Sequence, residues 1–173
     1  MKQPDFYESQ KFTQWWLWMV ILSTCIIITG ISILEIYEQF VKGIPYGNKP
    51  MSDTGLVMFS VFSMALSIGL AWLFSTLELE IKIDRYGVHY RYFPIIPSWK
   101  TVSPATIKNW EVKKYFTLGY GIRHGLGVKT LNVKGRMGLM LHFTNRRSLR
   151  LGTQKPDEIE EAMIALYNRF NEQ

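Results

Sequence analysis

The side chains that could do chemistry are scattered along this chain rather than clustered. His89, His124 and His142 are far apart and lack the spacing of metal ligands. The acidic residues between positions 157 and 161 fit the solvated face of a helix better than an acid–base pair, because nothing nearby in sequence would split their pKa values. Cys25 is the single cysteine, so one chain can form neither a disulfide nor a multi-cysteine zinc site. We therefore expect no catalytic set, no metal and no cofactor, and we predict that the protein is not an enzyme.

A glycine-rich stretch, residues 119–127, invites comparison with a phosphate-binding loop. A dinucleotide-binding fingerprint needs G-x-G-x-x-G between a strand and a helix. Here His124 stands where the third glycine belongs, and the residues that follow have the pattern of a strand. The stretch is better explained by turns and a bulge than by nucleotide binding.

Four basic residues are the candidates for contact with an anion or a protein partner: Arg123, His124, Lys113 and Lys114. Arg123 has an equally good structural alternative, in which its guanidinium binds a backbone carbonyl or a neighbouring strand. Arg146, Arg147 and Arg150 share a predicted hairpin, but strand alternation would point Arg147 away from the other two.

The charge distribution favours a membrane surface or a partner over nucleic acid. Residues 78–173 hold 16 Lys and Arg against 9 Asp and Glu, whereas residues 1–77 hold 4 against 5. An excess of this kind suits adhesion to an anionic leaflet, although an ordinary soluble surface also carries net charge. No dense basic stripe or nucleic-acid motif is present, so we expect no nucleic-acid partner.

The chain contains two long segments without charged residues, Phe12 to Leu34 and Thr54 to Leu77. Their location determines where the candidate residues lie. Each segment exceeds the ~20 apolar residues that a helix needs to cross a bilayer. We predict transmembrane helices at 15–37 and 55–77, a loop at 38–54 and an N-terminal tail at 1–14. Neither apolar segment contains Asp, Glu, Lys, Arg or His, which argues against a transporter or channel.

Basic residues near the membrane set the expected orientation. Five lie on the side of the two termini, namely Lys2, Lys11, Lys82, Arg85 and Arg91. Two lie in the loop between the segments, Lys42 and Lys49. Both termini are therefore predicted to be cytoplasmic, in a multi-pass protein of the cytoplasmic membrane.

Small residues recur every four positions on the second apolar segment, at Ser63, Ser67 and Ala71. This spacing lets helices approach closely. The stripe can pack against the first segment near Gly30, or it can join two copies of the chain in a homo-oligomer.

Residues 78–173 predict a small β domain that ends in a helix. Alternating apolar residues, as at 77–83 and 139–143, indicate about seven short strands in a meander. From Pro156 to Phe170 one helical face is apolar, with acidic residues in the first turn. We expect an α+β membrane protein in which a two-helix hairpin precedes a seven-stranded barrel or sandwich capped by the C-terminal helix.

Several short elements of this region form a recognisable set: Gly119 to Arg123, Asn132-Val133 with Gly135, Gly138, and the Gly152-Thr153-Gln154-Lys155-Pro156 segment. They resemble one family, the bacterial pleckstrin-homology-like (PH-like) domain proteins with two N-terminal membrane helices. The resemblance covers residues 79–167 and implies a membrane-tethered barrel in a bacterial cytoplasmic membrane. It implies little about biochemistry, and lipid-headgroup binding does not follow from the fold.

We expect a non-catalytic binding or scaffold module, anchored in the bilayer, whose domain contacts a membrane-proximal protein partner or the anionic leaflet. An immunity factor against an antimicrobial peptide (a bacteriocin) is one alternative, which the resemblance suggests. An accessory subunit of a membrane enzyme or transporter is another.

Overall fold

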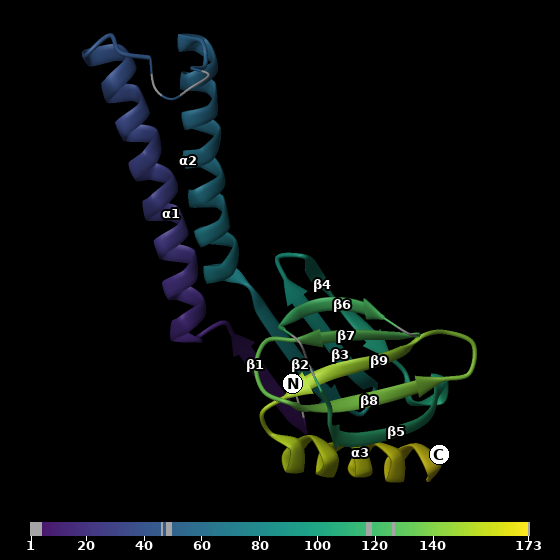
Figure 1. The fold of residues 1–173 in the computed structure, drawn as a ribbon. Helices are drawn as coiled ribbons and strands as arrows, with labels where there is room; N and C mark the ends of the chain where they lie inside the picture. The colour runs from purple at the N-terminus through teal and green to yellow at the C-terminus, as the bar shows by residue number, and fades with distance from the viewer. Residues whose placement is uncertain (1–4, 46, 48–49, 117–118, 126, 173) are drawn as a thin grey trace. The chain divides into compact units, whose positions relative to one another are not determined.

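The computed structural model describes residues 5–45, 47, 50–116, 119–125 and 127–172 (Figure 1). It divides into two compact units, a helical unit of Thr13–Ser75 and a β unit that joins the chain up to Phe12 with everything from Thr76 onward. Lys2 and Lys49, which enter the predicted orientation, lie outside the described residues.

The helical unit contains two long apolar helices. Helix α1 (Trp15–Ile36) continues into a π-helical turn, η1 (Tyr37–Val41), and α2 (Asp53–Thr76) follows the loop. At 1.5 Å per residue, α1 and α2 are about 33 and 36 Å long, enough for a hydrocarbon core of about 30 Å. Most of their large apolar side chains are exposed, for example Ile26 and Met58. Two helices long and apolar enough to cross a membrane are thus present, as the sequence predicts.

The small residues of α2 are buried on one side of the helix. Ser60, Ser63 and Ser67 have little access to solvent, and Ala71 is half-buried. The Cys25 Sγ of α1 lies 3.7 Å from the Ser67 carbonyl oxygen. A Cβ added at Gly30 would meet nothing within 4 Å, so Gly30 does not mark a close approach between helices. Packing within one chain accounts for Ser63 and Ser67, and the homo-oligomer stays a prediction.

The β unit is built from two sheets and one helix. Sheet A is antiparallel, in the order β1 (Phe6–Lys11), β2 (Glu78–Asp84), β3 (Gly87–Phe93) and β4 (Ile96–Val102). A 3₁₀ turn, η2 (Pro104–Thr106), leads to sheet B. Sheet B has the order β5-β8-β9-β7-β6, with β7 and β9 parallel; its strands are β5 (Ile107–Lys114), β6 (Gly121–Gly125), β7 (Val128–Asn132), β8 (Met137–Phe143) and β9 (Ser148–Thr153).

The expected seven-stranded barrel needs correction. Nine strands are present among the described residues, and no ladder there joins sheet A to sheet B, so the barrel is not closed. Between β4 and β5 the chain turns through Pro104, which has no N–H to donate to a ladder. The additional strands are β1, in the predicted tail, and β6, in the glycine-rich stretch.

The core of the β unit is formed by buried residues of both sheets and of the last helix, α3 (Pro156–Asn171). Leu79, Ile81 and Ile83 of β2 are fully buried, as are Leu139 and Leu141 of β8. The apolar stripe of α3 is buried too, with Ile159, Met163 and Leu166. The alternation in β2 and the helical period in α3 therefore predicted these elements correctly.

Strand β1 is fixed to the β unit by buried polar contacts as well as by its ladder. The Glu8 carboxylate accepts hydrogen bonds from the Thr153 hydroxyl at 2.6 Å and the Gln154 N–H at 2.9 Å. The Gln10 amide donates to the Gly152 carbonyl at 2.8 Å. The Gly-Thr-Gln segment before α3 thus receives the inward face of β1, and this contact gives that segment a structural role.

Candidate anion-binding site

The β unit has a pocket of about 410 Å³. It lies between β3 and β4 of sheet A and the facing strands of sheet B. Its apolar wall consists of Tyr90 and Val102 from sheet A with Phe143 and Leu149 from sheet B. The other lining residues are basic, namely His124, Lys129, Arg146 and Arg147. No carboxylate, serine or cysteine lines this pocket in the described part of the chain.

Strand register brings the basic residues together. His124 of β6 lies directly opposite Lys129 of β7, so the two side chains share one face of the sheet. Lys129 in turn is paired with Leu149 of the parallel strand β9. Arg146 and Arg147 come from the turn between β8 and β9 and complete the basic side of the pocket.

Local contacts orient Arg146. Its guanidinium carbon lies 3.8 Å from the centre of the Phe143 ring. This is a cation–π contact, in which the aromatic face attracts the positive charge. One of its nitrogens donates to the Thr106 hydroxyl at 3.3 Å. Burial raises the pKa of the Tyr90 hydroxyl and the Arg146 charge opposes that rise. Tyr90 therefore stays protonated at neutral pH and can donate a hydrogen bond.

The positive charge at the pocket is not neutralised from within the described chain. None of the four basic residues forms an ion pair with a described carboxylate, whereas Lys113, Arg91 and Arg169 each have one. Unpaired guanidinium and ammonium groups beside an apolar wall suit a carboxylate or a phosphate attached to a larger body. The lining offers no acid–base pair, so the arrangement suits binding.

The predicted anion residues are not gathered at one place. Lys113 and Lys114 lie on β5 and Arg123 and His124 on β6, and these strands form the two edges of sheet B. Lys113 is paired with Glu111. Arg123 lies on the face opposite to His124 and donates to the Gly119 carbonyl oxygen, which is the structural alternative for this residue. His124 alone of the four lines the pocket.

Sequence reasoning missed Lys129, Arg146 and Arg147. The alternation that would separate Arg146 from Arg147 applies to strands, but both residues precede β9 and lie in the turn. Arg150, within β9, instead places its guanidinium carbon 4.7 Å from the centre of the Tyr115 ring. The Asn-Arg-Arg sequence indicated a turn with two adjacent arginines. The conformation of that turn, which the sequence does not give, decides that both arginines line the pocket.

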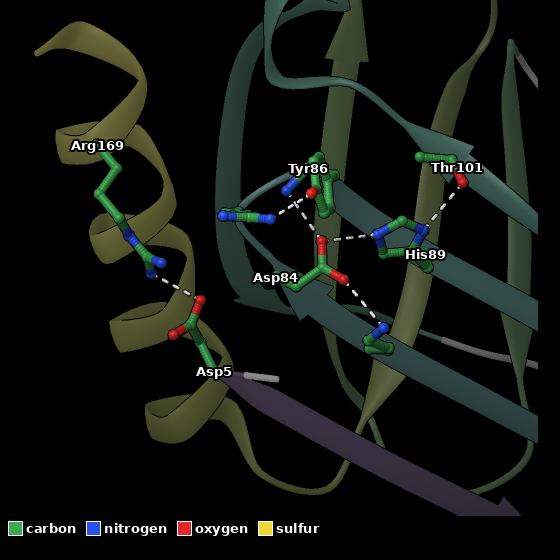
Figure 2. A network of polar contacts seen from close by, with 8 residues as sticks. Asp5, Asp84, Tyr86, His89, Thr101 and Arg169 are labelled. Atoms are coloured by element: carbon green, nitrogen blue, oxygen red, sulfur yellow. Dashed lines mark hydrogen bonds and ion pairs between the residues drawn. The ribbon is translucent and has the colours of Figure 1, made fainter. Parts of the chain in front are cut away.

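A second polar network lies on the other face of β3 and β4 (Figure 2). His89 bridges Asp84 and Thr101, with both ring nitrogens at 2.9 Å from an oxygen. Asp84 also accepts from the Tyr86 N–H and pairs with Lys82. Burial alone would raise the pKa of Asp84, but hydrogen bonds from His89, Lys82 and the Tyr86 N–H lower it to about 2.

This network has the acid–imidazole–hydroxyl order of a nucleophilic triad, but it lies apart from the pocket. His89 and Thr101 alternate along their strands with Tyr90 and Val102, which line the pocket from the opposite face. We interpret the network as a set of structural hydrogen bonds that links β2, β3 and β4. No group of three or more potential metal ligands is found among the described residues.

Comparison of the chain with protein-family models, with curated proteins and with solved structures gives no match.

Proposed function

We propose that this protein is a membrane-anchored, non-catalytic binding module of a bacterial cytoplasmic membrane, and that its pocket receives an anionic group of a protein partner. The observation that carries the proposal is the convergence of His124, Lys129, Arg146 and Arg147 on one apolar-walled pocket without a described counter-charge. A carboxylate or phosphate on a partner supplies that charge.

Several features support the membrane anchor. Both long helices expose apolar side chains along their length, and hydrocarbon tails would cover that surface. Strand β1 precedes α1 and strand β2 follows α2, and the two strands pair from Phe6–Ile83 to Lys11–Glu78. The ladder requires both ends of the helical hairpin to be on one side of the bilayer. The five basic residues that flank the segments on the side of the termini, against two in the loop, favour the cytoplasmic side.

The proposed fold of the β unit is PH-like. Two antiparallel-rich sheets followed by one C-terminal helix with a buried apolar stripe support this assignment. The resemblance of the Gly-Thr-Gln-Lys-Pro segment supports it as well. The fold by itself carries no ligand, so the pocket and not the fold supports binding.

A protein partner explains the pocket better than the anionic leaflet does. Tyr90, Val102, Phe143 and Leu149 provide an apolar wall, which complements a side chain that carries both apolar and charged atoms. Leaflet adhesion needs only a charged surface near the headgroups. Short chain connections, three residues between β1 and α1 and one between α2 and β2, would keep such a partner close to the membrane.

Photocrosslinking of the full-length protein in native bacterial membranes tests the proposal. A photoreactive phenylalanine analogue replaces Thr144, an exposed residue beside Arg146. We expect a discrete protein adduct that disappears when Arg146→Glu and Arg147→Glu are introduced together. The matched control is Arg85→Glu, which reverses an exposed arginine at the β2–β3 turn and should leave the adduct unchanged.

The outcomes separate the alternatives. An adduct unaffected by the double reversal contradicts the pocket, and loss of lipid adducts alone favours leaflet adhesion. An immunity factor predicts that deletion sensitises cells to a bacteriocin without changing growth. An accessory subunit predicts that the adduct contains an enzyme or transporter whose activity falls on deletion.

A further inference from the structure

The hairpin between β3 and β4 presents an uncharged, largely apolar tip. From Tyr92 to Trp99 the chain carries no ionisable group other than the Tyr92 phenol. Phe93 and Ile95 are 40% and 56% exposed, and Trp99 is 39% exposed. Two prolines, Pro94 and Pro97, flank the Ile95-Ile96 pair. Aromatic and aliphatic side chains are thus exposed together at this tip, with no charged residue among them.

Strand register fixes where the tip lies in sheet A. Phe93 is the partner of Glu78, and Glu78 is also the partner of Lys11. The tip therefore lies at the end of the sheet where β1 leaves for α1 and where β2 arrives from α2. The opposite end of the same strands carries the Asp84-Arg85-Tyr86 turn.

Chain connectivity alone limits how far the tip can be from the end of the second long helix. Glu78 follows Thr76, the last residue of α2, by two positions, a span of at most about 7 Å. The paired residues Glu78 and Phe93 add about 5 Å. Phe93 is thus within about 12 Å of the end of α2, close enough for the tip to reach a headgroup layer that is about 5–8 Å deep on each side of the hydrocarbon core.

We propose that the β3–β4 hairpin tip, Phe93 to Ile95, inserts into the lipid headgroup region of the bilayer. The inference rests on the proposed function, because it requires α1 and α2 to cross the bilayer. Aromatic and apolar residues favour that interface. Trp99, which lies on β4 with the Arg91 guanidinium carbon 4.9 Å from its ring centre, extends the same surface. The tip gives the β unit a third attachment to the membrane and restricts its rotation.

Depth-dependent fluorescence quenching tests the insertion. The full chain with Cys25→Ser receives a single Ile95→Cys, is labelled with an environment-sensitive dye and is reconstituted in phosphatidylcholine–phosphatidylglycerol vesicles. Nitroxide lipids labelled near the headgroups should quench this dye at least twofold. The matched control is Tyr86→Cys in the same background, an equally exposed position at the other end of the sheet, which should show little quenching.

Two results would overturn the inference: absence of quenching at position 95, or equal quenching at positions 95 and 86. Carbonate extraction of the same vesicles separates this failure from failure of the proposed function. If the chain resists extraction but position 95 is not quenched, only the insertion is wrong. If carbonate removes the chain, the membrane anchor and the insertion are both wrong.

Discussion

Glu8 is a carboxylate that is only 6% exposed, and its two partners lie far away in the sequence. Thr153 and Gln154 donate to it just before α3. Removing one member of such a set leaves buried donors without an acceptor, which costs about 1–3 kcal/mol.

We expect Glu8→Ala to loosen β1. Hydrogen exchange of the β1 amides in the full-length protein in nanodiscs should accelerate about tenfold, which corresponds to about 1.4 kcal/mol. Ser9→Ala is the control: it removes an exposed hydrogen bond from the Ser9 hydroxyl to the Glu78 carboxylate and leaves every buried contact of β1 in place, so it should change exchange little. Unchanged protection of β1 in Glu8→Ala would show that the Glu8 hydrogen bonds are not needed to hold the strand, which would then depend on the ladder to β2 and on Gln10.

Asp84 leads to a prediction about pH. Because its pKa is lowered to about 2 in the folded protein, against about 3.9 when unfolded, the stabilisation is complete above pH of about 4 and is lost as the pH falls toward 2. Asp84→Asn should lower the free energy of unfolding at pH 7 by about 1–2 kcal/mol, and the difference from wild type should vanish near pH 2. Urea unfolding in detergent micelles at both pH values measures this difference, and a constant difference would contradict the assignment.

At the scale of elements, the close packing of β9 at Gly152 can be tested. A Cβ there would lie 2.8 Å from the Asn132 Cβ and 3.1 Å from the Tyr115 hydroxyl oxygen. Gly152→Ala should therefore lower stability by about 1–3 kcal/mol through overpacking. Gly125→Ala, where an added Cβ meets nothing within 4 Å, should be nearly neutral. Thermal unfolding of both variants checks the contrast, and equal melting temperatures would contradict the close packing.

Elements with a conventional apolar pattern could be predicted from the sequence, and two strands could not. In β2 the inward residues Leu79, Ile81 and Ile83 are all apolar, so the alternation is plain. In β1 two of the three inward residues, Glu8 and Gln10, are polar, and their burial depends on partners in β9 and the turn after it. Strand β6 begins and ends with glycine, a residue depleted in strands.

The candidate site shows the same limit. The basic excess and His124 were visible in the sequence, but the pocket depends on the His124–Lys129 register and on a turn conformation. Neither follows from local residue preferences.

For the whole molecule, the proposed topology predicts a labelling pattern. Single cysteines are introduced in a Cys25→Ser background at Met51→Cys in the loop between the helices, and at Tyr86→Cys and Asn171→Cys in the β unit. All three positions are exposed. A membrane-impermeant maleimide should label position 51 in intact cells and the other two only after permeabilisation, because the β1–β2 ladder keeps both ends of the hairpin together.

The reverse pattern, with positions 86 and 171 labelled in intact cells, would invert the orientation. Labelling of all three in intact cells would contradict a two-span protein.

The pairing of β1 with β2 has a consequence for biosynthesis. The first strand is complete when residue 11 has been made, but its partner begins only at residue 78. With the proposed topology, both helices must be synthesised and inserted before the ladder can form. A molecule that inserted only one of them would leave its two strands on opposite sides of the bilayer, with Thr153 and Gln154 lacking their carboxylate. Completion of sheet A would thus require that both helices have been inserted correctly.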